Sequence, residues 1–403
     1  MASHPLPTID AAQRRARLAT RHHLTPQARA RSPVEAARDL VGLHATDPAS
    51  VYLGALARTT RLDVPTMESA LYDERSLLKI LGMRRTMFVV PLDLAAVIQA
   101  ACTRAIAVRE RRRLIAMIEG AGFAKDPMRW LADVEAATVQ ALEARGEAVA
   151  TELTKDVPGL REQIAFGAGR KWQGTMGMST RVLFLLGMEG RIIRARPRGS
   201  WISSQYRWAP VGRWLDGGLS DWPTEAAQVE LVRRWLATFG PGTVKDIQWW
   251  TGWTLGETRR ALAAIETAEV DLDGAIGGAT SATGLVLADD LAPVPEPEPW
   301  AALLPALDST VMGWSAREWF LGAHRPALFD TNGNAGPTIW WGGRVVGGWG
   351  QRNDGEVVVR LLEDVGAEGK TAVGAAAERV GAWLGGVRIT PRFRTPLEKE
   401  FSG

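Results

Sequence analysis

Four prolines occupy alternate positions from Pro293 to Pro299, and this stretch constrains the fold more than any other. Proline fixes its own φ angle and has no backbone N–H, so the stretch can form neither an α-helix nor a central strand. We interpret Asp289–Pro299 as a linker between two parts of the chain. With 403 residues, the chain has room for about two to four domains, each with its own core.

The composition is that of a soluble globular protein, with 46% hydrophobic and 23% charged residues. No apolar run is long enough to cross a bilayer, and Met1–Pro5 lacks the basic-then-apolar order of a signal peptide. We therefore expect a cytoplasmic protein. The single Cys102 and five scattered histidines give neither an internal disulfide nor zinc-ligand spacing, so we expect no metal and no cofactor.

The net charge of +3 hides a strong asymmetry along the chain. Residues 1–213 hold 32 Lys+Arg and 20 Asp+Glu, a balance of +12, whereas residues 214–403 hold 16 and 25, a balance of −9. The basic part is where a polyanion should bind, and its arginines suit bidentate phosphate contacts. The alternative is a basic surface that only faces water. A predicted N-terminal helix, which either follows a phosphate backbone or is simply exposed, carries Arg14, Arg15, Arg17, Arg21, His22 and His23.

Two predicted helices meet at a short polar link. Ser32–Glu35 reads as a capping box with proline at the first helical position, which predicts a helix from Pro33 to about Leu43. Asp47 and the proline after it predict the start of the next helix. His44 and Thr46 would lie in the link, and an imidazole, a hydroxyl and a nearby carboxylate can orient a water molecule. The alternative is that these residues only end and cap the two helices.

The first 120 residues show three helices followed by a strand pair, which is the order of a winged-helix module. Arg84 and Arg85 would lie at the mouth of its wing. A long helix from Leu92 to about Ile118 should follow. Its second half carries arginines that either track phosphates or favour the helix C-terminus through its dipole, namely Arg104, Arg109, Arg111, Arg112 and Arg113.

Residues 121–220 form a second predicted module. A helix over Met178–Met188 precedes two strands joined by a Pro/Gly turn, in which Arg198 could reach a phosphate or the minor groove. Arg170 and Lys171 precede this helix beside a tryptophan, a combination that suits nucleic acid but also occurs at domain junctions.

Residues 221–290 form a third predicted module with the clearest helix-turn-helix. Capping boxes begin at Thr243 and Thr254 and flank a Thr251–Gly252 turn. Because this part of the chain is acidic, the module either binds DNA or serves for packing.

Residues 300–403 read as a small β-rich domain with short strands and one helix from about Thr371 to Trp383. Asn332–Gly336 forms a tight turn there, either structural or at the rim of a site. The expected fold class is therefore α+β, with three tandem winged-helix modules and a β-rich C-terminal domain.

Four phrases in this chain together resemble the AlkZ/YcaQ family of bacterial DNA glycosylases. They are Leu40–Ala49, Leu303–Asp308, Asn332–Pro337 and Val346–Trp349. The resemblance covers about residues 10 to 395. It implies a monomeric, nucleoid-associated enzyme that acts on double-stranded DNA containing alkylated purines. It further implies excision of bulky or crosslinking N7-alkylguanines, in DNA repair and in resistance to DNA-alkylating natural products.

The family's catalytic motif is usually Gln-x-Gln or Gln-x-Asp, whereas this chain has His44 and Thr46 at those positions. Either the pair holds the attacking water and the developing sugar cation, or the protein has lost catalysis and is a winged-helix DNA-binding regulator. An N7-alkylated purine already carries a positive charge, so it leaves without an acid. His44 could also serve as a general base, and Asp47 could stabilise the cation.

The motif contains no lysine for a Schiff base, which favours a monofunctional hydrolase over a lyase. A third possibility is a drug-sequestering protein, because 17 tryptophans offer stacking surfaces.

Overall fold

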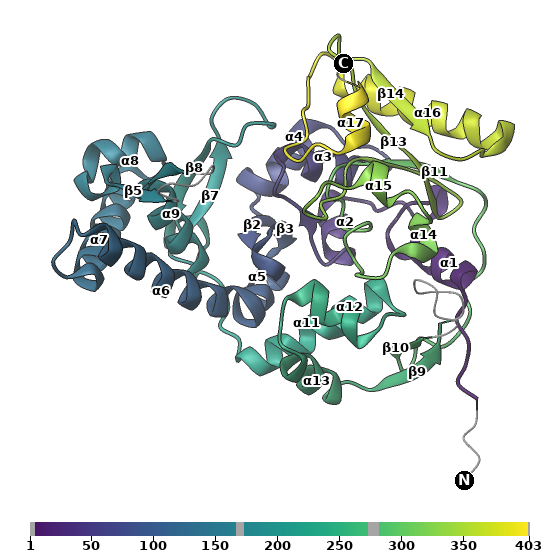
Figure 1. Cartoon of the computed structure of the whole chain (residues 1–403), viewed down its shortest axis with the longest axis horizontal. Coiled ribbons are helices and arrows are strands. Elements are labelled where there is room, and N and C mark those ends of the chain that lie inside the picture. Colours follow the sequence, from purple (N-terminus) through teal and green to yellow (C-terminus); the bar gives the residue numbers. More distant parts are fainter. Residues whose placement is uncertain (1–4, 167–172, 273–281, 402–403) are drawn as a thin grey trace.

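The computed structural model describes residues 5–166, 173–272 and 282–401 (Figure 1). Helices and small antiparallel sheets alternate along the chain, which confirms the predicted α+β class. The predicted DNA contacts Arg170 and Lys171 lie outside the described residues.

The first part of the chain forms a helical layer around a three-stranded sheet of order β1-β3-β2. A π-helical stretch, Gln99–Thr103, joins two helices into the long helix that the sequence predicts. The elements are α1 (Ala11–Arg21), α2 (Pro33–Asp39), β1 (Leu43–His44), α3 (Pro48–Leu56), α4 (Val64–Glu68), β2 (Leu77–Leu81), β3 (Met87–Pro91), α5 (Leu92–Ile98) and α6 (Arg104–Ala121).

The link between α2 and α3 differs from the prediction. The Ser32 hydroxyl caps α2 by accepting from the Glu35 N–H at 3.1 Å, but the helix ends at Asp39 rather than near Leu43. Gly42 has φ +112°, and a Cβ there would lie 2.8 Å from Val90 Cγ1. The chain turns at this glycine, and His44 pairs with Phe88 as part of a short strand. A two-residue strand has too little periodicity to be recognised in a sequence.

One face of the N-terminal helix α1 is buried, so the interpretation of α1 as simply an exposed helix was wrong. Arg14, Arg17 and His22 are almost fully covered. Arg17 donates to the Asp290 carboxylate and to the Ala292 carbonyl, both at 2.7 Å. Arg17 and Arg21 of α1 therefore hold the linker against the fold.

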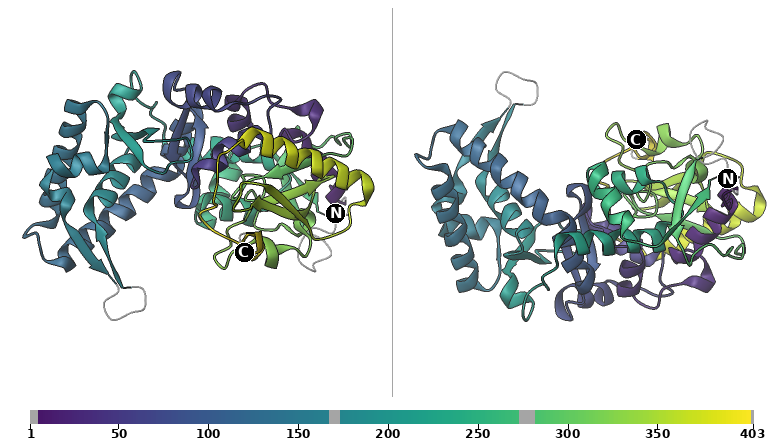
Figure 2. Two further views of the ribbon diagram at one scale, coloured as in Figure 1. Left: turned by 90° about the horizontal axis from the view of Figure 1, so that it is seen from above. Right: turned by 90° about the horizontal axis from the view of Figure 1, so that it is seen from below.

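The second part forms a lobe at one end of the molecule in all three views (Figures 1 and 2). A three-stranded sheet of order β4-β8-β7 packs on its helices, and β5 pairs with β6. The predicted helix over Met178–Met188 is confirmed by α9. The elements are α7 (Pro127–Arg145), β4 (Ala148–Val149), α8 (Ala150–Asp156), β5 (Gln163–Phe166), β6 (Gly174–Gly177), α9 (Met178–Met188), β7 (Ile192–Pro197), β8 (Tyr206–Pro210) and α10 (Val211–Trp214).

The third part contains the predicted helix-turn-helix. Both capping boxes are present, at Thr243 with Asp246 and at Thr254 with Glu257, and Gly252 ends the first helix with φ +76°. The elements are α11 (Thr224–Phe239), α12 (Val244–Thr251), α13 (Leu255–Ala263), β9 (Thr267–Asp271) and β10 (Thr283–Leu287).

The linker is irregular, as predicted, and the C-terminal part is an antiparallel sheet of order β11-β12-β13-β14 covered by α16. Helix α16 begins at Gly366, before the predicted start near Thr371. The elements are β11 (Ala301–Leu304), α14 (Glu318–Leu321), α15 (Arg325–Leu328), β12 (Thr338–Trp341), β13 (Arg344–Gln351), β14 (Val357–Leu361), α16 (Gly366–Leu384) and α17 (Pro396–Phe401).

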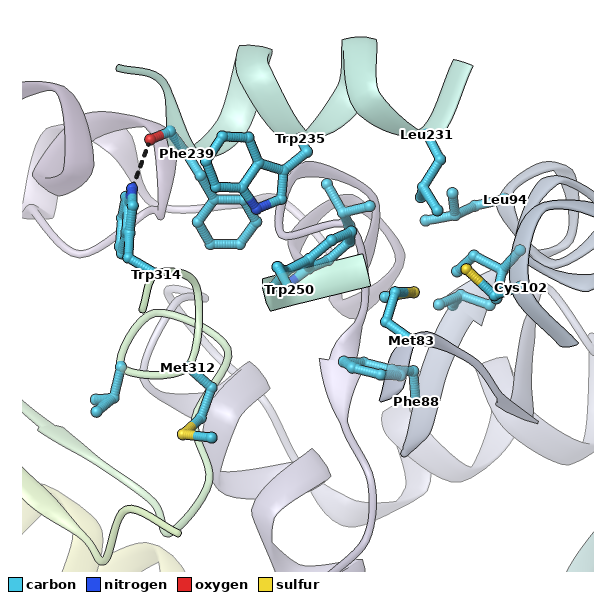
Figure 3. Close-up of a cluster of buried hydrophobic side chains, with 14 of the residues drawn as sticks. Met83, Phe88, Leu94, Cys102, Leu231, Trp235, Phe239, Trp250, Met312 and Trp314 are labelled. Carbon is cyan, nitrogen blue, oxygen red and sulfur yellow. Dashed lines mark hydrogen bonds between the residues drawn. The ribbon is translucent and has the colours of Figure 1, made fainter. Parts of the chain in front are cut away.

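A shared aromatic core joins the third part to the first and the last (Figure 3). Trp235 and Phe239 of α11 stack, with ring centroids 5.7 Å apart, and Trp250 of α12 packs beside them. Trp314, from the C-terminal part, donates its indole N–H to the Phe239 carbonyl at 3.1 Å. Since these rings belong to one buried cluster, the helix-turn-helix is fixed against both neighbours.

Candidate active site

His44 and Thr46 line one pocket of about 400 Å³ where the first, third and C-terminal parts meet. The β2–β3 hairpin, helix α12 and three loops of the C-terminal part complete its wall. Its lining residues are His44, Thr46, Arg84, Arg85, Thr86, Trp249, Leu307, Met312, Ser315, Arg317, Arg325, Asn332, Gly333, Asn334 and Phe393.

The His44 imidazole is held neutral at the pocket wall. Its side chain is 6% exposed and packs edge-on against Phe88, with ring centroids 5.5 Å apart. Burial lowers the pKa of His44 to about 3, and the positive charges of Arg84 and Lys79 add to this effect. Nδ1 is fully buried and has no hydrogen-bond partner. Nε2 is not buried in this way, so it is the ring nitrogen that keeps access to the pocket.

The low pKa argues against the general-base role. Protonating an imidazole of pKa about 3 at neutral pH costs about 5 kcal/mol, more than the same step at an ordinary histidine. The positive charge of the neighbouring Arg84 is part of this cost. His44 is therefore suited to orient a water molecule rather than to take its proton.

This assignment predicts that the pH profile of the chemical step has no inflection from His44. An ordinary histidine base would protonate below its pKa of about 6.5, and the rate would then fall about tenfold per pH unit. With a pKa of about 3, His44 stays neutral, so the single-turnover rate should be flat between pH 5.5 and 8.

Circular dichroism at each pH provides the control for folding. The unfolded chain takes up the His44 proton near pH 6.5, whereas the folded chain does not, so this group's contribution to stability is lost as the pH falls below 6.5. An inflection near pH 6.5 that disappears in His44→Gln would contradict the orienting role.

Thr46 and Asp47 face different surroundings although they are adjacent. Thr46 is half-buried and lines the pocket. Asp47 is not among the lining residues, because its carboxylate caps α3 and accepts from the N–H groups of Ala49 at 3.1 Å and Arg392 at 3.2 Å. The second contact fixes the segment that brings Phe393 into the pocket. Asp47 thus acts as a cap and tether in this structure, and its proposed role as a stabiliser of the sugar cation has no support here.

Arg84 and Arg85 form the tip of the β2–β3 hairpin, and both line the pocket. Their φ angles, +50° and +62°, lie in the left-handed region, which costs about 1 kcal/mol or more for each such residue. Arg84 lies 3.8 Å above the Trp249 ring, and its backbone approaches Gly252 of α12. Arg85 donates to Glu110 at 3.0 Å. The hairpin tip is thus packed against the third part and does not project as a free wing.

Three polar groups of the pocket come from the C-terminal part, and two of them, Arg317 and Arg325, were not predicted as site residues. Arg317 is 2% exposed, lies 4.7 Å from the Trp249 ring centroid and has an unpartnered Nε. Arg325 is exposed at the rim. The Asn332–Asn334 turn is held by the Asp330 carboxylate, which accepts from two backbone N–H groups at 2.8 Å. The tight turn therefore lies at the rim of a site, one of the two alternatives left open by the sequence.

The remaining predicted DNA contacts are exposed but lie outside the pocket. They are Arg109, Arg112 and Arg113 on α6 and Arg198 in the β7–β8 turn. Their neighbour Arg111 is instead an internal ion-pair partner of Glu135 and Glu189. These four arginines remain proposed DNA contacts.

The described part of the chain holds no group of three or more side chains suited to bind a metal ion. Across the same residues, no helix combines the length and apolar character that a membrane span needs. Ten tryptophans are buried in the core, which leaves few rings to stack on a free drug. They are Trp201, Trp208, Trp214, Trp235, Trp250, Trp300, Trp314, Trp319, Trp340 and Trp349.

Comparisons with known proteins give two findings. The sequence model of the family described as DNA glycosylase AlkZ-like matches residues 37–383. Among solved structures, the Streptomyces sahachiroi DNA glycosylase AlkZ is similar, with a TM-score of 0.70 and 20% sequence identity over 96% of this chain and 99% of that chain. Curated proteins give no match. At this identity, the likeness to the solved structure speaks for the fold alone.

Proposed function

Because this chain belongs to the AlkZ-like DNA glycosylase family, we propose that it hydrolyses the N-glycosidic bond of N7-alkylguanine in double-stranded DNA, including bulky adducts and crosslinks. One observation carries the proposal. His44 and Thr46, at the positions of the family's paired polar motif, line a single pocket that also presents four arginines. A polar pair that only ended helices would have no reason to share a cationic pocket with residues from two other parts of the chain.

The reaction needs little from the protein beyond positioning. Alkylation at N7 makes the purine a cation, so the C1′–N9 bond breaks and its electron pair neutralises the base. The oxygen of water then bonds to C1′, and its proton passes to solvent. The enzyme must hold the water near the sugar and accommodate the sugar cation, and positioning alone can supply several kcal/mol of rate acceleration.

His44 and Thr46 divide the task of holding water. A buried N–H without a partner destabilises a fold more than a buried acceptor without one. We therefore assign the His44 proton to Nε2, which leaves Nδ1 as the buried acceptor. Nε2–H then donates to the water oxygen, and the Thr46 hydroxyl accepts one of the water hydrogens. A remaining lone pair of the water is free to attack C1′.

A monofunctional hydrolase fits this pocket better than a lyase. No lysine is among the described residues that line it. The nearest lysine that affects His44, Lys79, is buried in a separate cavity and donates to the Tyr206 hydroxyl. Schiff-base chemistry would need an accessible amine beside the sugar.

We further propose that the enzyme acts as a monomer at the nucleoid and serves in repair and in resistance to DNA-alkylating natural products. This biological role rests on the family. The range of adducts that the protein excises is therefore the measurement that tests this role.

The test is an excision assay over N7-guanine adducts of graded size, from methyl to a polycyclic alkylator. The proposal predicts free alkylated base and alkali-labile abasic sites, with bulky adducts among the substrates. A non-catalytic winged-helix regulator, the second candidate from the sequence, would bind every duplex and leave every adduct intact. Excision of N7-methylguanine with no excision of larger adducts would keep the glycosylase activity but refute the bulky substrate class.

A further inference from the structure

The charge of the pocket around His44 does not match the substrate that it is proposed to process. Four guanidinium groups line it, and none of its described lining residues is a carboxylate. An N7-alkylated purine and the sugar cation that follows are both positive. The pocket must therefore hold something besides the departing base.

Three of these guanidinium groups lack a carboxylate partner. Within residues 5–166, 173–272 and 282–401, no ion pair involves the side chain of Arg84, Arg317 or Arg325, whereas Arg85 pairs with Glu110. The nearby Asp246 carboxylate forms no ion pair with them. One of its oxygens instead accepts hydrogen bonds from the Ser315 and Ala316 N–H groups at 2.9 and 3.1 Å. A desolvated cation without a partner destabilises a fold, and a bound anion would remove that cost.

Arg317 is also close enough to Arg325 and Arg84 to be repelled by both. Burial lowers the pKa of Arg317 to about 9, with Arg325 and then Arg84 as the next largest causes. Arg84 and Arg317 lie at the same Trp249 ring, 3.8 and 4.7 Å from its centroid. The ring holds both guanidinium groups near one another, and a negative charge within reach of both would relieve their repulsion.

We propose that this pocket binds a phosphodiester group of the DNA backbone, held between Arg84 and Arg317 at the rim formed by Arg325 and the Asn332–Asn334 turn. A phosphodiester has two non-bridging oxygens, which match the paired N–H groups of a guanidinium. This inference rests on the proposed function because it places the backbone beside the glycosidic bond that is cleaved.

The phosphate would supply the counter-charge that the protein lacks. The Asp47 carboxylate accepts hydrogen bonds from the Ala49 and Arg392 N–H groups and does not line the pocket. His44 is neutral. A phosphate held beside the nucleotide at His44 and Thr46 would place a negative charge near C1′ when the sugar becomes positive, without forming or breaking any bond itself.

Binding to undamaged duplex DNA tests the site without reference to excision. Arg317→Gln and Arg84→Gln should each weaken binding about 10- to 100-fold, since hydrogen bonds to charged groups are worth about 1.5–3 kcal/mol. Each should also make the slope of log K against log salt concentration shallower by about 0.9, the loss of one phosphate contact. Arg317→Lys should keep the slope, because it keeps the charge.

Arg14→Gln is the matched control. Arg14 is also 2% exposed, also lies over a tryptophan ring, at 4.0 Å, and does not line the pocket. Its loss should reduce stability and leave the salt slope unchanged. If Arg317→Gln has the wild-type salt slope, or if Arg14→Gln lowers the slope equally, the phosphate site is refuted.

A modified substrate then locates the phosphate. In wild-type protein, one uncharged methylphosphonate in a linkage next to N7-methylguanine should slow excision about 10- to 100-fold. In Arg317→Gln the same linkage should cause no further loss. Losses that multiply at every flanking linkage would contradict the proposal. Absence of excision by the wild type would refute the proposed function, while the salt slopes would still decide whether the phosphate site exists.

Discussion

His44→Ala should lower the single-turnover excision rate of N7-methylguanine by at least about 100-fold while leaving affinity for duplex DNA nearly unchanged. The neutral imidazole is proposed to hold the attacking water, and removal of one positioned group of this kind commonly costs about two to three orders of magnitude. DNA affinity should persist because the side chain is almost fully buried and carries no charge at neutral pH.

Two further variants separate orientation from proton transfer. His44→Gln should retain more activity than His44→Ala, because an amide can still orient water but cannot act as a base at neutral pH. Thr46→Ala should slow excision by about tenfold, the value of one hydrogen bond. Full activity in the His44→Ala/Thr46→Ala double variant would remove this pair from the mechanism.

Arg58→Ala should lower the free energy of unfolding by about 3–5 kcal/mol, the largest stability effect that we expect from one substitution. The Arg58 guanidinium is fully buried and donates to both oxygens of Asp308, at 2.6 and 2.9 Å, and to the Thr310 hydroxyl at 2.8 Å. Removing it leaves the Asp308 carboxylate buried without its charge partner.

The consequence of Arg58→Ala should extend to the site. Arg58 follows α3, which starts directly after His44 and Thr46, and Asp308 begins the loop that brings Met312 and Arg317 to the pocket. Urea unfolding measures the effect, with Arg352→Ala as the control. The Arg352–Glu356 pair is more than half exposed on both sides, so its loss should cost less than about 1 kcal/mol. A change below about 1 kcal/mol in Arg58→Ala would show that this ion pair does not fasten the two parts.

Local chemistry explains what the sequence could predict. A helix N-cap is recognised from about four consecutive residues. The predicted N-caps are all observed, each at the start of a helix, namely Ser32, Asp47, Thr243 and Thr254. The Asp289–Pro299 linker follows from proline geometry in the same way. The resemblance carried by four short phrases is confirmed by the family match over residues 37–383.

What the sequence could not predict depends on contacts between distant segments. Arg317 and Arg325 join His44 from about 270 residues away, and they belong to the acidic half of the chain, so the charge asymmetry directed attention away from them. Arg17, by contrast, was read as a surface cation and is buried against Asp290. A residue count assigns charge to a segment, but only the fold decides which charges face a pocket.

The most direct test of the central claim, that His44 and Thr46 direct water to a nucleotide bearing a cationic purine, is product analysis of one reaction. Wild-type protein in excess over N7-methylguanine duplex is quenched with borohydride, and the mixture is separated by mass spectrometry. We expect free N7-methylguanine, an abasic strand and no protein–DNA adduct from wild-type protein, and we expect His44→Ala to form little of either product. A borohydride-trapped adduct, or an intact N7-methylguanine strand with wild-type protein bound to it, would contradict the account.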